Sequence, residues 1–134
     1  MEQGIQDNFP HEAIQKYGCY YLCLCKYAEL ISAMKFDISH ITGYYNTLVK
    51  IGYMEADCFI VNPVAVLNRL ANKNTVKDVR KTFEPPLRDI YLKYLKKPGH
   101  GHFVLVHDGK IWDSLTPDRP GAKDYKVDSY RVLI

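Results

Sequence analysis

The sequence predicts an α+β fold, in which an N-terminal helical part with a buried central helix packs on a C-terminal antiparallel β-sheet. Residues 19–34 would be apolar on nearly every side of a helix, which is typical of a helix buried all round. Residues 102–107 are β-branched and aromatic, and the Asp-Gly pair that follows them favours a hairpin. At 134 residues the chain fits a single domain, residues 1–134.

Composition narrows the class of protein. Hydrophobic residues make up 47% of the chain and charged residues 25%, which is enough apolar surface for a folded domain and excludes disorder. The net charge of +3 is scattered along the chain, so we expect no nucleic-acid partner. No apolar run approaches the ~18 residues that span a bilayer, and no secretory signal is seen, so we expect a cytoplasmic protein with no membrane partner.

The N-terminal residues indicate where the central helix begins. Residues 1–17 read as a polar lead-in, with one helical turn expected at 11–15. Gly18 then separates this polar segment from the apolar run that follows. We expect the central helix to begin directly after this glycine and to run over 19–34.

Two further helices are indicated by their capping residues. Asp37 suits an N-cap, apolar residues follow it at helical spacing, and Gly52 suits the C-terminal stop. Asn62 followed by Pro63 is typical of a helix start, because Pro is favoured at the first helical position. The sequence therefore predicts three helices before the sheet begins.

The second half of the chain carries strand signals. Residues 75–83 and 88–96 are ambiguous between helix and strand; we assign them as strands, because a Pro-Pro pair separates them and Tyr, Ile and Val recur. Residues 102–107 and 110–115 are expected to form the two arms of a hairpin, and 125–133 the last strand. These strands would form a meandering antiparallel sheet.

The register of the expected hairpin follows from its turn. If Asp108 and Gly109 are the two loop residues, counting places Asp113 opposite Val104 and one diagonal step from His102. Diagonal neighbours lie roughly 7–8 Å apart at the backbone, within reach of a His–Asp side-chain pair. The expected pairs are His107–Lys110, Val106–Ile111, Leu105–Trp112, Val104–Asp113, Phe103–Ser114 and His102–Leu115. A carboxylate on this apolar face needs a partner, and the imidazole of His102 would supply it.

Cys19 would complete a catalytic arrangement with this pair. It follows Gly18 and opens the central helix, where unpaired N–H groups and the helix dipole stabilise a thiolate. An imidazole oriented by a carboxylate is the base that such a nucleophile requires. The remaining cysteines are expected in the core, since free Cys is usually buried; they are Cys23, Cys25 and Cys58.

The order Cys, His, Asp resembles that of the papain-like cysteine peptidases. Among them, the bacteriocin-processing (double-glycine leader) peptidases are similar in length. The matching blocks are GCYYL at 18–22, GHFVLV at 101–106 and WDSL at 112–115. QKYGCYYLCL and HFVLVHDGKIWDSL also look like a small family of phage and spirochaete proteins. The resemblance implies a papain-like domain with Cys19 as nucleophile, His102 as general base and Asp113 as orienting residue.

The same resemblance bears on the oxyanion hole that acyl transfer needs. The families usually place a Gln six positions before the Cys, where this chain has Ala13. Gln15 is the nearest substitute, with the backbone N–H of Cys19 as the second donor. Gln15 is therefore the possible side-chain donor of the oxyanion hole.

These residues predict a cysteine peptidase or amidase that hydrolyses a peptide or isopeptide bond through a thioester on Cys19, with a peptide or protein as substrate and no cofactor. A catalytically degenerate papain-like fold that acts as a binding module is the alternative, and the 11 Tyr residues favour it. Metal binding by Cys19, Cys23 and His102 is a third interpretation, although a fourth ligand is not evident.

Overall fold

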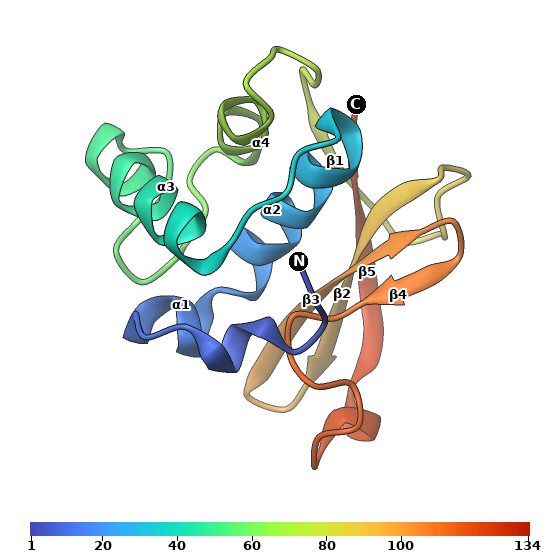
Figure 1. Cartoon of the computed structure of the whole chain (residues 1–134). Helices are drawn as coiled ribbons and strands as arrows, with labels where there is room; N and C mark the ends of the chain where they lie inside the picture. Colours follow the sequence, from blue (N-terminus) through green and yellow to red (C-terminus); the bar gives the residue numbers. More distant parts are fainter.

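The computed structural model describes residues 1–134 and confirms the α+β class (Figure 1). The helices are α1 (Glu12–Tyr17), α2 (Cys19–Ser32), α3 (Ile38–Ile51) and α4 (Pro63–Ala71). The strands are β1 (Val79–Thr82), β2 (Ile90–Lys97), β3 (His100–His107), β4 (Lys110–Trp112) and β5 (Lys126–Leu133). Short 3-10 helices occupy Ile5–Asn8 and Ala122–Asp124. The helices gather on one side of the sheet. No helix is both long and apolar enough to cross a bilayer.

Helix α2 is the element on which the two parts of the fold meet. It contacts both α4 and β3, and most of its side chains are buried. It begins at Cys19 as expected and ends at Ser32, where Ala33 takes a left-handed conformation with φ of 54°. The central buried helix is therefore confirmed, with an end two positions before the expected one.

The capping residues of α3 and α4 act as the sequence indicates. The Asp37 side chain accepts a hydrogen bond from the His40 amide at 2.8 Å, and Gly52 ends α3 with φ of 89°. The Asn62 side chain accepts from the Ala65 amide at 3.1 Å, with Pro63 at the first position of α4. Each bond satisfies an amide that has no partner within its own helix, so local sequence is sufficient to set these boundaries.

The five-stranded sheet is antiparallel, with the order β1-β5-β2-β3-β4. A meander is confirmed only for β2, β3 and β4, because β5 inserts between β1 and β2. Val79 of β1 pairs with Leu133, and Leu92 of β2 pairs with Arg131. The expectation of a continuous meander was therefore wrong. The last strand supplies hydrogen-bond partners to both earlier strands, and this long-range pairing leaves no local signal.

The β3–β4 hairpin has the expected turn and register but a shorter second arm. Asp108 and Gly109 have φ of 50° and 76°, as a tight hairpin turn requires. The observed pairs are His107–Lys110, Val106–Ile111 and Leu105–Trp112. Beyond them, the carbonyls of Asp113 and Ser114 accept from the amides of Gly4 at 3.0 Å and Gln6 at 2.8 Å. The expected strand 110–115 is therefore confirmed only to Trp112. The expected pairs beyond it are wrong, because the N-terminal segment takes those backbone groups; they are Val104–Asp113, Phe103–Ser114 and His102–Leu115.

Candidate active site

His102 and Asp113 are in contact at one end of the sheet. Nε2 of His102 lies 2.6 Å from Oδ1 of Asp113, and the two residues are only 2% and 6% exposed. His102 comes from β3, and Asp113 comes from the chain directly after β4. The hairpin register thus brings the two side chains together, as the sequence argument expected, even though the second strand has ended.

Asp113 is held by two further donors. Its Oδ1 accepts from the Leu115 amide at 3.0 Å, and its Oδ2 accepts from Nη1 of Arg119 at 3.0 Å. Burial raises the pKa of Asp113, but these bonds and the one from His102 outweigh burial and hold the pKa below its ordinary value. Asp113 is therefore a carboxylate at neutral pH, fixed in one orientation. Sequence reasoning missed Arg119, which follows Asp113 in the turn-rich loop.

His102 lies between this carboxylate and the thiol of Cys19. Burial lowers the pKa of His102, but the hydrogen bond to Asp113 and the neighbouring Cys19 thiol outweigh burial and raise the pKa to about 9. The ring is therefore an imidazolium at neutral pH. Because Asp113 engages Nε2, the other ring nitrogen, Nδ1, has no hydrogen-bond partner within the chain. The structure thus pairs His102 with Asp113 and places Cys19 near enough to act on the pKa of the ring.

Cys19 is the first residue of α2, and aromatic packing fixes that helix start against β3. The rings of Tyr20 and Phe103 stack with centroids 4.2 Å apart. One turn further along α2, the Cys23 thiol donates to the Phe103 carbonyl at 3.5 Å. Phe103 is the neighbour of His102 in the strand, so these contacts set the separation of Cys19 and His102.

Gly18 makes the corner that places Cys19. It caps the end of α1 and the start of α2, and its amide donates to the Ile14 carbonyl at 3.0 Å. A Cβ at position 18 would lie 2.4 Å from that carbonyl oxygen. No side chain fits there unless the last turn of α1 moves away from the corner, so glycine is required next to Cys19.

Gly18→Ala is expected to lower the free energy of unfolding by about 2 kcal/mol, the usual scale for overpacking a tight contact. Gly43→Ala is the matched control, because Gly43 lies in the exposed part of α3 and a Cβ there meets nothing within 4 Å. That control should be neutral or stabilising, by up to about 1 kcal/mol. Urea unfolding of both variants measures the difference; equal stabilities would show that the corner tolerates a side chain.

A cleft of about 650 Å³ opens beside Cys19. Its lining comes from α1, α2, the chain before α4, and strands β2, β3 and β5; the residues are Tyr17, Cys19, Tyr20, Asp57, Cys58, Phe59, Ile60, Tyr94, Gly101, Phe103 and Arg131. The aromatic side chains and Arg131 were not singled out from the sequence. Adjacency to His102 in the sequence could have indicated Phe103, but Arg131 reaches the cleft only through the insertion of β5.

Gln15 does not belong to this cleft. Its side chain is exposed and donates to the Asp7 carbonyl at 3.2 Å. Its own carbonyl accepts from the buried side chain of Gln6 at 3.0 Å. The expectation that Gln15 donates to an oxyanion is therefore wrong, because α1 directs this side chain toward the N-terminal segment. The backbone N–H of Cys19, in the first turn of α2, remains as a donor.

The other cysteines lie in the core, as expected. Cys23, Cys25 and Cys58 are no more than 3% exposed, and burial raises the pKa of each thiol. No group of three or more His, Cys, Asp and Glu side chains is arranged to hold a metal ion. The metal site considered for Cys19, Cys23 and His102 is therefore not formed, and the Cys23 thiol is turned to a backbone carbonyl instead.

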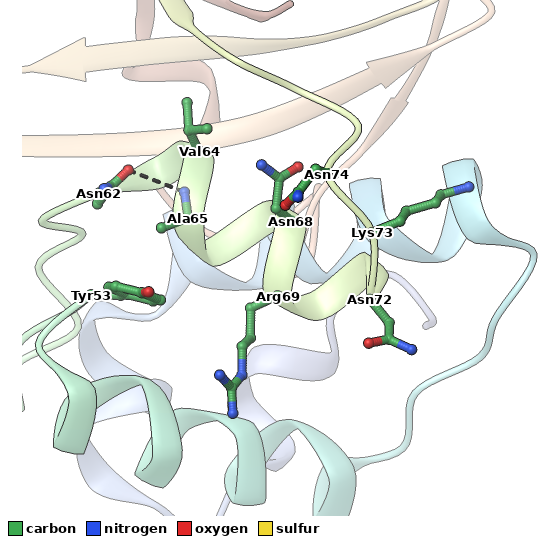
Figure 2. A pocket seen from close by; sticks show the side chains of 9 residues that line it. All are labelled: Tyr53, Asn62, Val64, Ala65, Asn68, Arg69, Asn72, Lys73 and Asn74. Atoms are coloured by element: carbon green, nitrogen blue, oxygen red, sulfur yellow. Dashed lines mark hydrogen bonds between the residues drawn. The ribbon is translucent and has the colours of Figure 1, made fainter.

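A second hollow, of about 670 Å³, lies along α4 and is lined mainly by polar side chains (Figure 2). Two of the asparagine side chains that line it form hydrogen bonds to the backbone. Asn62 caps α4, and the Asn68 side chain bonds the backbone of Thr75 and Val76 at 2.8–3.0 Å. None of the three residues of the Cys–His–Asp arrangement lines this hollow. We therefore place the candidate active site at the cleft beside Cys19.

Comparison with known proteins places the chain in a protein family. A family model described as "Protein of unknown function, DUF261" matches residues 2–134. No curated protein and no solved structure matches the chain. Any assignment of chemistry therefore depends on the side chains that the fold brings together.

Proposed function

We propose that this chain, which belongs to the family of proteins of unknown function DUF261, is a cysteine peptidase or amidase that hydrolyses a peptide or isopeptide bond. The observation that carries the proposal is the buried His102–Asp113 pair beside Cys19, which starts a buried helix at the edge of an open cleft and acts on the pKa of the His102 ring. A nucleophile, a base and an orienting carboxylate are the parts that covalent acyl transfer requires.

The order of these elements also supports a papain-like arrangement. The nucleophile starts a buried helix in the N-terminal part, and the histidine and aspartate follow on an antiparallel sheet. The same order was the basis of the resemblance to papain-like peptidases. We propose that fold for the chain on this ground.

The proposed reaction has two half-reactions. The Cys19 thiolate attacks the carbonyl carbon, a C–S bond forms, and the negative charge on oxygen is met by the N–H of Cys19. The His102 imidazolium gives its proton to the leaving nitrogen as the C–N bond breaks, which leaves a thioester and a free amine. Water then attacks the thioester while neutral His102 takes its proton, and the acid leaves with Cys19 restored to its thiolate.

Asp113 acts throughout as a positioning residue. Its bond to Nε2 fixes the ring and leaves Nδ1 free for the proton transfers, and its charge stabilises the imidazolium. Arg119 and the Leu115 amide hold Asp113 in turn. The base is thus set in place before substrate arrives, which reduces the reorganisation that the reaction needs.

Selective alkylation of Cys19 tests the proposal. Iodoacetamide near neutral pH, followed by peptide mapping, should label Cys19 at least about tenfold faster than glutathione, because the thiolate is the reactive species. Cys58 is the internal control, because it lines the same cleft and burial raises its thiol pKa to about 12. Cys58 should label slowly.

Hydrolysis is tested with a mixture of peptides of diverse sequence, in which mass spectrometry identifies new termini. Cys19→Ala should abolish the cleavages and Cys58→Ala should retain them. The proposal fails if Cys19 labels no faster than glutathione and Cys19→Ala leaves every cleavage unchanged.

A binding module is the second candidate function, and one observation favours it. The side chain expected to complete the oxyanion hole, Gln15, is engaged elsewhere on an exposed face. A cleft with aromatic walls and a weakened catalytic centre suits recognition of a peptide. If the chain is a binding module, Cys19→Ala should retain function in the cell. Loss of function in that variant would support the hydrolase instead.

A further inference from the structure

One wall of the cleft beside Cys19 is built from aromatic side chains. Rings of Tyr20, Tyr94 and Phe103 lie against one another, with centroids 4.2 Å apart for Tyr20–Phe103 and 4.7 Å apart for Tyr94–Phe103. Phe59, on the chain before α4, is 61% exposed at the same cleft. Phe59 is exposed and the other three rings are partly exposed, so an apolar group of a ligand can pack against them.

Arg131 lies among these rings. Its guanidinium carbon is 5.7 Å from the centroid of Tyr94 and 5.6 Å from that of Phe103, within cation–π range. Its Nη1 donates to Ser129 Oγ at 2.8 Å and to the Tyr130 carbonyl at 3.2 Å. Both hydrogen bonds use one nitrogen, so the Nη2 and Nε donors have no partner within the chain. The guanidinium is thus held in place with one edge free.

No carboxylate neutralises Arg131. The ion pairs within 4.0 Å do not include it. Asp57 lines the same cleft, but its Oδ1 accepts from the Phe59 amide at 3.0 Å and makes no ion pair. Burial raises the pKa of Tyr20 to about 12, with Arg131 acting in the opposite direction, so the Tyr20 hydroxyl supplies no anion at neutral pH. The charge of Arg131 is left for a ligand.

We propose that Arg131 is a specificity-determining residue that binds a carboxylate of the substrate while an apolar group of the same substrate lies on the aromatic wall. This proposal rests on the proposed hydrolase function and names its substrate class: a peptide with a carboxylate close to the bond that Cys19 attacks. A planar guanidinium with two free donors matches a carboxylate in geometry and charge. A neutral amide at the same place would leave that charge unpaired.

The carboxylate has two possible sources, an acidic side chain or the C-terminus of a peptide chain, and two pairs of probes distinguish them. N-acetylphenylalanine against its primary amide tests the terminal carboxylate. N-acetyl-Phe-Glu-amide against N-acetyl-Phe-Gln-amide tests the side chain. Within each pair the apolar ring is constant and the charge alone differs.

The readout is protection of Cys19 from iodoacetamide, followed by peptide mapping. In the native chain the carboxylate member of at least one pair should protect at about tenfold lower concentration than its amide partner, the scale of a charge-assisted bidentate contact. Arg131→Met should make the two members equal, and Arg131→Lys should retain part of the preference. Arg80→Met is the control, because Arg80 is exposed on β1 and pairs with Asp78; it should behave as the native chain.

Equal protection by both members of both pairs, or no protection by any probe, would overturn the proposal, as would a preference that persists in Arg131→Met. Protection reads only whether the cleft is occupied, because alkylation of Cys19 needs no hydrolysis. A chain that prefers carboxylates but cleaves nothing would therefore refute the hydrolase and retain the specificity of Arg131. Circular dichroism of each variant confirms that the comparison is between folded proteins.

Discussion

Replacing His102 by Gln is expected to lower the rate of peptide hydrolysis by about 1,000-fold, within the usual contribution of a general acid–base residue. Glutamine can still bond to Asp113, so the core around it should remain folded. It can neither protonate the leaving nitrogen nor take a proton from water. His100→Gln is the matched control, because His100 lies exposed at the start of the same strand; it should retain full activity.

A readout that does not depend on the substrate separates charge from structure. The His102 imidazolium attracts the iodoacetate anion toward Cys19, so the rate of alkylation by iodoacetate relative to iodoacetamide should be high near pH 7. Because the pKa of His102 is raised to about 9, this ratio should fall as the pH rises through about 9. In His102→Gln the ratio should stay flat over the same range. A native ratio that is also flat would show that His102 carries no charge beside the thiol.

The parts of the site that could be predicted are those fixed by local sequence. Gly18 followed by an apolar helix places Cys19 at a helix start, and the structure has that boundary. The Asp-Gly turn sets the hairpin register by counting, and this register brings His102 within 2.6 Å of Asp113. Such signals act over a few residues, where backbone geometry leaves few choices.

The exact conformation after the hairpin was beyond local rules. The strand that the sequence indicated over 110–115 stops at Trp112, because Gly4 and Gln6 bond the next carbonyls. The contact with His102 survives because Asp113 needs only to remain near the end of the strand. A correct side-chain pair thus came from a partly incorrect strand.

The side chains that line the cleft could not be read from the sequence, for a topological reason. Arg131 reaches the cleft because β5 inserts beside β2, which places it opposite Leu92. Arg119 reaches Asp113 through an irregular loop. Gln15 was misplaced for a related reason: its direction depends on how α1 lies against the N-terminal segment. Each of these outcomes is decided by packing between segments far apart in sequence.

Asp113→Asn is expected to lower the free energy of unfolding by about 3 kcal/mol near pH 6, the lower end of the cost of breaking a buried ion pair. The change removes the charge that faces both His102 and Arg119 while it keeps the shape of the side chain. Asp118→Asn is the control, because Asp118 is an exposed carboxylate of the same loop; its stability should be unchanged. Urea unfolding followed by Trp112 fluorescence measures both.

The pH dependence gives the sign of this effect. The folded pKa of His102 is raised to about 9 from 6.5, so its contribution to stability is complete below about pH 6.5 and is lost as the pH rises through about 9. The folded pKa of Asp113 is lowered from 3.8, so its contribution is present above about pH 4 and is lost as the pH falls through the folded value.

The difference in the free energy of unfolding between the native chain and Asp113→Asn should therefore be largest between about pH 4 and 6.5. It should shrink toward pH 9 and above, where only the bonds from Arg119 and Leu115 distinguish the two. A difference that does not change between pH 6 and pH 10 would mean that His102 is neutral in the folded protein. The Cys19 thiol would then have to give its own proton to the ring before the ring could protonate a leaving nitrogen.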